Sequence, residues 1–348
     1  MRMLVVGLGI QGNKRQAIAG DDVVATVDPV NPKADYADAR QAPLDSYDGA
    51  FVCTPDQTKL ELLNYLLSNG KHVLVEKPLL AAHNEQISRL IDLARSNGVT
   101  CYTAYNHRFE PHIARLKEVL ESSQLGQVYL ARFFYGNGTA RNVRQSPWRD
   151  EGIGVLSDLG SHLLDISLLL FGPVENSFAP WSFNCFENRA FDHVTFGSRD
   201  SRPVIEMEAT LLSWRNTFTV DIFGELGTAH VNGLRKWGPS AFTIRKRVFP
   251  SGKPDEERLV LEQADSTWAA EYNYFKELCQ NGLSNLDNDI WINTILNQVS
   301  QQVAKGNDNE NENLALTPQP PLPIWERGSR ASDGGEGEYT PFSGESSV

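Results

Sequence analysis

The sequence predicts an α/β protein with two domains, a doubly wound parallel sheet followed by an α+β domain with a mostly antiparallel sheet. Two observations carry this prediction. Residues 1–106 alternate short apolar runs with helix-like segments at the spacing of βαβ units. Residues 107–305 instead contain successive runs of alternating apolar and polar positions, which is typical of antiparallel strands. The length of 348 residues also favours more than one domain.

The first predicted strand is the short apolar run Met3–Val6, which is typical of a strand buried on both faces of a parallel sheet. Helix-like segments lie between this run and the later ones. Two of them end at Gly70 and Gly98, because glycine commonly follows the last turn of a helix. We predict strands at 3–6, 23–27, 50–53, 72–75 and 99–102, and helices at 11–19, 60–69 and 84–97.

The second predicted domain combines strands that follow one another with a few longer helices. The segment from Gly224 to Gly227 is a candidate hairpin turn between two of the strands. We therefore expect one sheet with helices packed on one side. The predicted strands are 128–135, 192–198, 204–213, 216–223, 228–231 and 242–248, and the predicted helices are 109–122, 157–171, 267–281 and 287–304.

Residues 306–348 differ from the rest of the chain in composition. Five prolines and many Gly, Ser, Glu and Asn residues replace the apolar periodicity, and the stretch cannot bury enough apolar surface to offset its ordering entropy. Residues 307–348 hold eight acidic and two basic side chains, so they supply half of the net charge of −12. We predict a disordered tail.

Composition excludes several classes of protein. Apolar residues make up 41% of the chain and charged residues 22%, as in a globular protein with a substantial core. No cluster of Lys and Arg stands out, so we expect no nucleic acid or anionic membrane as a partner. The longest apolar helix-like stretch, 163–171, is too short to span a bilayer.

The cysteines and the N-terminus indicate a reducing compartment. Four widely spaced cysteines form no C-x-x-C pair, which argues against a zinc or dithiol site, and Cys53 and Cys101 lie in apolar runs as small core residues. The chain enters a strand at once, without the pattern of a signal peptide. We therefore expect a cytoplasmic protein without a metal site.

A glycine-rich turn follows the first predicted strand and opens the first helix. In the pattern G-x-G-x-x-G, Gly7 permits the tight turn, Gly9 lets the backbone approach a pyrophosphate, and Gly12 lets helix and strand pack closely. Asp28 ends the second strand, at about the 20-residue spacing of the acid that binds ribose hydroxyls. The pattern predicts a Rossmann domain that binds NAD. NADP is less favoured, because a carboxylate repels its 2′-phosphate.

Polar residues end the third and fourth predicted strands, at the edge where a doubly wound sheet binds its ligand. Thr54 and Pro55 follow the third strand, either as a cofactor contact or as a plain strand-to-helix turn. Lys77 ends the fourth strand beside the expected nicotinamide, although an isolated lysine at a strand end is more often a solvated group. The predicted cofactor-binding residues are Gly7, Gly9, Ile10, Gln11, Gly12, Asp28, Thr54, Pro55, Glu76 and Lys77.

A second candidate group lies in the glycine-rich run from Gly152 to His162. Asp158 and His162 are four residues apart and would share one face of a helix. A histidine on an apolar helix is usually a core residue. A carboxylate one turn before it favours a functional role, because the acid can orient the imidazole and raise its basicity.

With these motifs in place, the sequence resembles the Gfo/Idh/MocA oxidoreductases, a family that includes glucose–fructose oxidoreductase and inositol dehydrogenase. The resemblance covers roughly residues 1–304, and its most specific parts are the triplet Glu76-Lys77-Pro78 and the pair of Asp158 and His162. Supporting motifs are the glycine turn at 7–12, Thr54-Pro55, the run Tyr105-Asn106-His107-Arg108-Phe109 and Pro147-Trp148-Arg149.

The resemblance implies a catalytic set of Lys77, Asp158 and His162. His162 would be the general acid or base on the reacting oxygen, Lys77 would polarise that oxygen, and Asp158 would hold substrate or tune the imidazole. Asn106 and Arg149 are candidate substrate contacts and equally good structural polar groups. The Lys77–Pro78 bond is commonly cis in the family. The chain departs from the family at 56–59, where Asp-Gln-Thr-Lys replaces a stretch that often contains a histidine.

The resemblance thus implies an NAD-dependent oxidoreductase that transfers hydride between nicotinamide and a hydroxyl or ketone of a sugar, cyclitol or nucleotide-sugar. Two alternatives remain: an NAD-using glycosidase with transient oxidation, and a non-catalytic NAD-binding sensor. The expected partners are a small-molecule substrate and further copies of the chain, because the open sheet of the second domain is often an oligomerisation surface in this family.

Overall fold

The computed structural model describes residues 1–146, 149–174 and 177–316 of the chain. The chain divides into two units, Met1–Gly306 and Asn307–Val348. The first unit contains both sheets, and the sites described below lie within it. Among the described residues, no helix is both long enough and apolar enough to cross a membrane.

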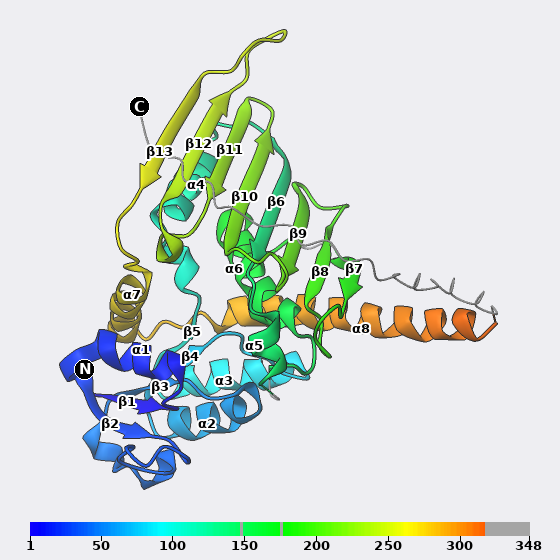
Figure 1. Ribbon diagram of the computed structural model, residues 1–348. Helices are drawn as coiled ribbons and strands as arrows, with labels where there is room; N and C mark the ends of the chain where they lie inside the picture. Colours follow the sequence, from blue (N-terminus) through cyan, green and yellow to red (C-terminus); the bar gives the residue numbers. More distant parts are fainter. Residues whose placement is uncertain (147–148, 175–176, 317–348) are drawn as a thin grey trace, which may run out of the picture. The chain divides into compact units, whose positions relative to one another are not determined.

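The N-terminal sheet has five parallel strands in the order β2-β1-β3-β4-β5, which confirms the predicted Rossmann-type sheet (Figure 1). Strands β1, β3 and β5 are buried along their whole length, as expected when helices cover both faces. The strands are β1 (Met3–Val6), β2 (Val23–Val27), β3 (Gly49–Val52), β4 (His72–Glu76) and β5 (Cys101–Ala104), and the first three helices are α1 (Ile10–Ala19), α2 (Asp56–Ser68) and α3 (Asn84–Ser96).

One face of this sheet packs on α2 and α3, and the other packs on α1 together with a helix from the far end of the chain. That helix is α7 (Thr267–Asn281), whose side chains Tyr272 and Phe275 join the core formed by Met3 and Val5. Figure 1 shows α7 beside α1. Although the sequence assigned 107–305 to the second domain, α7 therefore completes the first one.

The second sheet has eight strands in the order β13-β12-β11-β10-β6-β9-β8-β7, and its neighbours are antiparallel except for β6 and β9. The mostly antiparallel sheet was predicted, but two of its edge strands, β7 and β13, were not. The strands are β6 (Val128–Gly136), β7 (Ala179–Asn184), β8 (His193–Ser198), β9 (Val204–Thr210), β10 (Thr217–Gly224), β11 (Gly227–Asn232), β12 (Ser240–Lys246) and β13 (Glu256–Leu261).

Alternate residues of β9 and β10 are buried, so one face of this sheet carries the core of the second domain. Three helices contribute to that core: α4 (Pro111–Glu121), α6 (Ser161–Phe171) and α8 (Leu286–Leu316). The short helix α5 (Ala140–Arg144) follows β6, a 3₁₀ segment covers Asn106–Phe109, a π-helical turn covers Leu156–Gly160, and a 3₁₀ turn covers Arg235–Trp237.

Helix α8 extends beyond the predicted end at residue 304 and reaches Leu316. The polar stretch 307–313 contains no proline or glycine, and the next proline is Pro318, which disfavours a helical conformation of the residue before it. The first part of the predicted tail of 306–348 is therefore helical. Its remainder, 317–348, lies outside the described residues.

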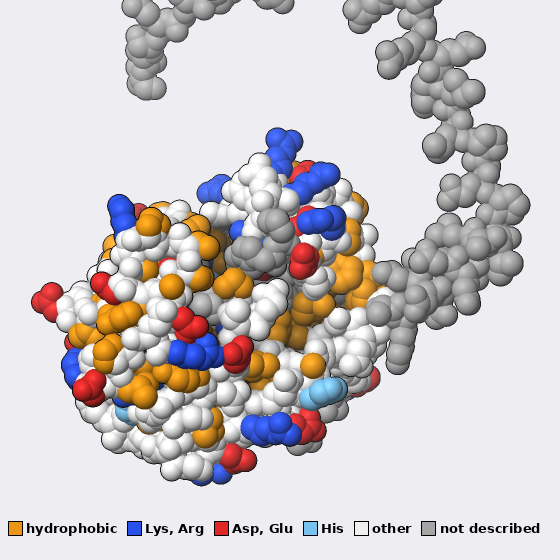
Figure 2. All heavy atoms as spheres, turned by 90° about the horizontal axis from the view of Figure 1, so that it is seen from below, with side chains coloured by type: hydrophobic (Ala, Val, Ile, Leu, Met, Phe, Trp, Pro, Cys, Tyr) orange, Lys and Arg blue, Asp and Glu red, His pale blue; other side chains and the backbone are white. Residues whose placement is uncertain are grey.

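The distribution of charge on the surface matches the ordinary composition. On the face shown in Figure 2, acidic and basic side chains are mixed, with apolar side chains between them. Such a mixed surface differs from the continuous basic stripe that nucleic-acid-binding proteins present.

Candidate active site

The glycine turn between β1 and α1 has the geometry that its sequence predicts. Gly7 has a φ of +94°, and a Cβ there would lie 2.6 Å from the carbonyl oxygen of Cys53. A Cβ on Gly12 would lie 1.8 Å from the carbonyl oxygen of Gly7, so helix and turn pack too closely for any side chain. At Gly9 a Cβ would meet no atom of the described chain within 4 Å, which leaves open space at the start of α1.

Three backbone hydrogen bonds hold the Asp28 carboxylate beside this turn. Its Oδ2 accepts a hydrogen bond from the Leu8 N–H at 2.8 Å, and its Oδ1 accepts from the N–H groups of Val30 and Asn31 at 3.0 and 2.9 Å. Burial raises the carboxyl pKa, but these three donors outweigh it and hold the pKa of Asp28 below its usual value. A fixed negative charge thus lies next to the glycine turn.

Three further features fit a dinucleotide at this edge of the sheet. Ile10, at the first position of α1, and Val30, just after Asp28, are both 87% exposed, although each is a large apolar side chain that could cover a ligand. The Thr54 hydroxyl after β3 is buried without a hydrogen-bond partner among the described residues. Buried hydroxyl groups normally have a partner, so a ligand atom could supply it.

Glu76 is committed to a buried ion-pair network rather than left free for a ligand. The Arg15 guanidinium of α1 donates from Nε to Glu76 at 2.7 Å, and its Nη2 lies 2.7 Å from a carboxylate oxygen of Glu271 in α7. Burial raises the pKa of Glu271 to about 7 despite the arginine. The predicted cofactor contact at Glu76 therefore serves to join α1, β4 and α7.

The segment after β4 places Lys77 so that its side chain reaches the second domain. The Lys77–Pro78 peptide bond is cis, as the resemblance implied. The buried Lys59 ammonium of α2 donates to the Pro78 carbonyl at 2.8 Å and also pairs with Asp56 at 2.6 Å. Asp56 and Lys59 therefore help to hold the turn that carries Lys77.

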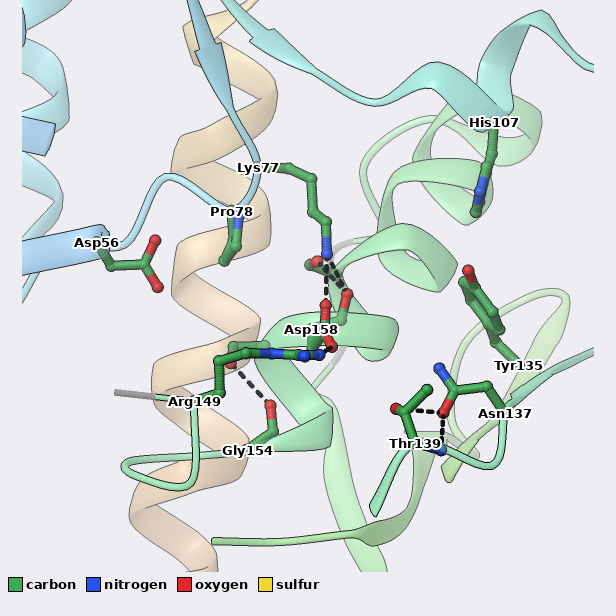
Figure 3. A network of polar contacts seen from close by, with 12 residues as sticks. Asp56, Lys77, Pro78, His107, Tyr135, Asn137, Thr139, Arg149, Gly154 and Asp158 are labelled. Atoms are coloured by element: carbon green, nitrogen blue, oxygen red, sulfur yellow. Dashed lines mark hydrogen bonds and ion pairs between the residues drawn. The ribbon is translucent and has the colours of Figure 1, made fainter. Parts of the chain in front are cut away.

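Asp158 is the meeting point of two cationic side chains (Figure 3). The Lys77 ammonium donates to the Asp158 carboxylate at 2.8 Å and to its backbone carbonyl at 2.6 Å, while Arg149 Nη2 donates to the other carboxylate oxygen at 3.1 Å. Against the effect of burial, these cations lower the pKa of Asp158 to about 2. Asp158 is 36% exposed and Arg149 34%, so a ligand can reach both.

The predicted pairing of Asp158 with His162 is replaced by the contacts with Lys77 and Arg149. The physical reason is local geometry: Leu156–Gly160 form a π-helical turn, in which residues four apart no longer lie directly above one another. Helix α6 begins only at Ser161. The His162 Nδ1 atom has no hydrogen-bond partner among the described residues.

His162 instead stacks on a second histidine that the sequence interpretation left without a role. The rings of His107 and His162 have centroids 4.0 Å apart and an angle of 22° between their planes. Arg108 donates to Asp165 of α6 at 2.8 Å, which ties the 3₁₀ segment of His107 to the helix of His162. Burial, with the charges of Lys77 and Lys236, holds the pKa of His162 well below its usual range, so its imidazole is neutral at physiological pH.

Two more residues missed by the sequence interpretation border the histidine pair. The Lys236 ammonium, in the 3₁₀ turn after β11, donates to the Tyr135 hydroxyl at 3.0 Å and lies 3.2 Å from His107 Nε2. The Tyr135 ring of β6 lies 5.8 Å from the His162 ring, centroid to centroid. His107 belonged to a motif quoted for the family, but nothing in the local sequence marks Tyr135 or Lys236.

Of the predicted substrate contacts, only Arg149 lies in this group. Asn106 is buried, and its amide donates to the Thr267 hydroxyl at 2.8 Å, so it helps to attach α7. Pro147 and Trp148 lie outside the described residues. The arrangement offers a neutral imidazole, an ammonium group and an acceptor carboxylate at the carboxyl edge of the first sheet. Such a set can move a proton to or from an oxygen atom and stabilise negative charge on it.

Two family models match the chain. The model of the "Oxidoreductase family, NAD-binding Rossmann fold" matches residues 1–105, and that of the "GFO/IDH/MocA C-terminal domain" matches residues 113–230. Among curated proteins, the NAD⁺-dependent scyllo-inositol 2-dehydrogenase of Bacillus subtilis is 23% identical over 318 residues, which cover 83% of this chain and 89% of that protein.

Other curated relatives match over shorter stretches. An uncharacterized oxidoreductase of Schizosaccharomyces pombe is 35% identical over 35% of this chain, and glucose-6-phosphate 3-dehydrogenase of Bacillus subtilis is 29% identical over 37% of it. The chain spans 33% and 38% of the lengths of these two relatives. They therefore show similarity to part of this chain.

Solved structures share the fold over both domains. A levoglucosan dehydrogenase in complex with NADH gives a TM-score of 0.75 at 17% identity, covering 88% of this chain and 97% of that one. An inositol dehydrogenase homologue from Azotobacter vinelandii in complex with NAD⁺ gives 0.72 at 17% identity, covering 88% and 96%. At these identities the likeness shows the fold.

Proposed function

Because the chain belongs to the Gfo/Idh/MocA oxidoreductase family, we propose that it is an NAD-dependent dehydrogenase or reductase. Its substrate would be a sugar, cyclitol or nucleotide-sugar that reacts at a hydroxyl or ketone group. The observation that carries the proposal is the convergence of Lys77 from β4 with Asp158 and His162 from the second domain. These groups lie at the carboxyl edge of the sheet whose glycine turn fits a dinucleotide.

His162 is the proposed general acid and base. Its neutral imidazole can accept the proton of a substrate hydroxyl during oxidation and return it during reduction. A histidine that remained protonated at neutral pH could not accept this proton, and the low pKa of His162 avoids that state.

Lys77 is the proposed electrophile. Its ammonium would donate a hydrogen bond to the reacting oxygen and stabilise alkoxide character there. The Asp158 carboxylate accepts hydrogen bonds from Lys77 and Arg149, and so it fixes the orientation of the Lys77 ammonium. Arg149 is partly exposed and free to bind a second hydroxyl of the substrate.

NAD is the proposed cofactor, held by the glycine turn and by Asp28. Gly9 leaves room for the pyrophosphate, the N-terminus of α1 faces it, and the Asp28 carboxylate can accept ribose hydroxyl groups. Bound nicotinamide supplies the hydride acceptor or donor. Because Asp28 is ionised, a 2′-phosphate at the same place would be repelled.

The same family membership supports association between copies of the chain. We propose that the face of the eight-stranded sheet opposite the helices is covered by a second copy. Val260 on β13, which pairs with Ala241, is an exposed apolar side chain of this face, and the half-buried Phe223 on β10 lies there beside His230. Light scattering of the purified protein should then give a mass above that of one chain, and Val260→Glu should lower it.

The test compares the turnover of variants in the site with that of matched variants outside it. The purified protein is given NAD⁺ and a panel of sugars, cyclitols and nucleotide-sugars, and absorbance of the reduced nicotinamide is followed. His162→Asn and Lys77→Ala should each lower kcat by at least about 100-fold, the usual contribution of a general acid or base. His83→Asn and Lys117→Ala, changes of the same kinds outside the site, should keep full activity. Normal rates in both site variants would overturn the proposal.

A further inference from the structure

Lys236 is a cation of the candidate site without an ion-pair partner among the described residues. Its ammonium contacts neutral groups: the Tyr135 hydroxyl at 3.0 Å, His107 Nε2 at 3.2 Å and the Trp237 ring, whose centroid lies 4.7 Å away. No carboxylate of the described chain forms an ion pair with it within 4 Å. An ammonium has three N–H donors, so at least one remains for a ligand. Part of the Lys236 residue is exposed to solvent, while its ammonium end is partly buried beside Tyr135 and His107.

The neighbouring cations differ from Lys236 in this respect. Lys77 and Arg149 both pair with Asp158, and Arg235, next to Lys236 in the chain, pairs with the buried Glu110 at 3.1 Å. Arg235 also donates to the Ser266 hydroxyl at 3.2 Å. These contacts hold the turn Arg235–Trp237 against the N-termini of α4 and α7, and the Lys236 ammonium lies beside His107 of the histidine pair.

Lys236 lies within reach of whatever binds to His162. The His107 ring that it contacts stacks on the His162 ring at 4.0 Å, and the Tyr135 ring lies 5.8 Å from the same histidine. Burial and the charge of Lys77 lower the pKa of Lys236 to about 8. Asp265 and Glu110 offset part of this effect, but Lys77 and Lys236 both act on His162, and an anion bound between the two lysines would relieve the repulsion.

We propose that Lys236 binds an anionic group of the substrate, so that the enzyme acts on acidic sugar derivatives in preference to neutral ones. This inference rests on the proposed function, because it names the substrate class of the same site. The anionic group is a carboxylate or a phosphate, either of which accepts charge-assisted hydrogen bonds from a lysine. The neutral part of the substrate would then present its reacting oxygen to Lys77 and His162.

The test compares three probes that share one sugar ring: D-glucose, D-glucuronate and D-glucose 6-phosphate. Calorimetric titration of each probe into the protein measures binding without turnover. For the wild type we expect at least one acidic probe to bind about tenfold or more tightly than glucose, and the tighter acid identifies the group. Lys236→Met should abolish this preference, Lys236→Arg should keep most of it, and Lys117→Met should leave it unchanged.

Two controls separate this inference from the proposed function. His162→Asn should lose turnover and keep the binding preference for the acidic probe. If the wild type turned over no sugar but bound the acid through Lys236, the proposed function would fail and the binding site would stand. Lack of any preference in the wild type, or a preference that survives in a folded Lys236→Met variant, would overturn the inference. Thermal melting establishes that the variants are folded.

Discussion

The imidazole rings of His107 and His162 lie stacked 4.0 Å apart, the ammonium of Lys236 lies 3.2 Å from His107 Nε2, and the charge of Lys77 lowers the pKa of His162. Two imidazolium ions could not occupy this place together, because like charges at such a distance repel strongly in a buried setting. Both histidines have a pKa well below the usual range, chiefly through burial and then through the neighbouring cations. Burial and the two lysines therefore keep His162 in the form that accepts a proton.

The first prediction concerns the acid limb of the pH–rate profile. Removing a positive neighbour favours the protonated imidazole, so Lys236→Met should raise the pKa of His162. With a neutral substrate, the pH at which kcat/KM falls on acidification should move upward by up to about one unit. Steady-state rates between pH 4 and 8 measure the shift. Lys117→Met, an exposed lysine of α4, should leave the limb in place, and an identical profile in Lys236→Met would contradict the assignment of His162.

The second prediction concerns Asp158. Asp158→Asn removes the charge that holds Lys77 and Arg149, so the ammonium group loses its orientation. We expect kcat to fall by about 100-fold or more. The change in melting temperature should be small, because a partly exposed ion pair contributes little to stability. A large loss of stability with normal turnover would show that Asp158 is structural.

The third prediction tests the buried network that joins α1 to α7. Arg15→Met leaves the carboxylates of Glu76 and Glu271 without their cation in the protein interior. Such a loss costs about 3–5 kcal/mol of unfolding free energy. Because burial raises the pKa of Glu271 to about 7, its carboxyl is often protonated, and Glu271→Gln should cost much less. Denaturant unfolding of the two variants measures the difference.

The fourth prediction concerns Asp289 on α8, which is buried and whose carboxylate oxygens have no hydrogen-bond partner among the described residues. Burial raises its pKa from 3.8 to about 8. Between these pH values the unfolded chain loses the proton while the folded protein keeps it. Stability should therefore fall as pH rises, by about 1.4 kcal/mol per pH unit at most.

Asp289→Asn removes this titration. The variant should gain stability relative to the wild type as pH rises from 4 to 8, with no further gain above about pH 8. Melting temperatures across this range provide the measurement. Equal pH dependence in both proteins would mean that Asp289 is ionised in the folded state.

The fifth prediction concerns cofactor choice. Asp28→Ser removes the fixed charge beside the glycine turn and keeps a small hydrogen-bonding side chain. The ratio of kcat/KM for NADP to that for NAD should rise by about tenfold or more, since one repelled charge is worth at least about 1.4 kcal/mol in a partly buried place. Fluorescence titration with NADPH and NADH gives the same comparison without a substrate. An unchanged ratio would mean that another residue selects the cofactor.

The local sequence contained enough information to predict the strands of the parallel sheet and the helices between them, with boundaries within four residues. Each strand of the parallel sheet is a short apolar run, and Gly7 and Gly12 occupy positions where any Cβ would collide with the backbone. These features depend on residues close together in the chain, so periodicity and turn chemistry reveal them. The sequence did not predict the edge strands β7 and β13. In β7 buried and exposed residues do not alternate, and in β13 every residue except the last is exposed, so neither strand has the usual apolar pattern.

The sequence by itself therefore determined the Rossmann sheet, the dinucleotide turn with Asp28, and the position of Lys77 at a strand end. Only the tertiary structure decided which groups meet there. In the folded chain Asp158 pairs with Lys77 and Arg149, and the rings of His107 and His162 stack. Lys236, from the turn after β11, contacts His107. Apart from Arg149–Asp158, these contacts join residues more than 50 positions apart in the chain, so a local sequence pattern does not reveal them.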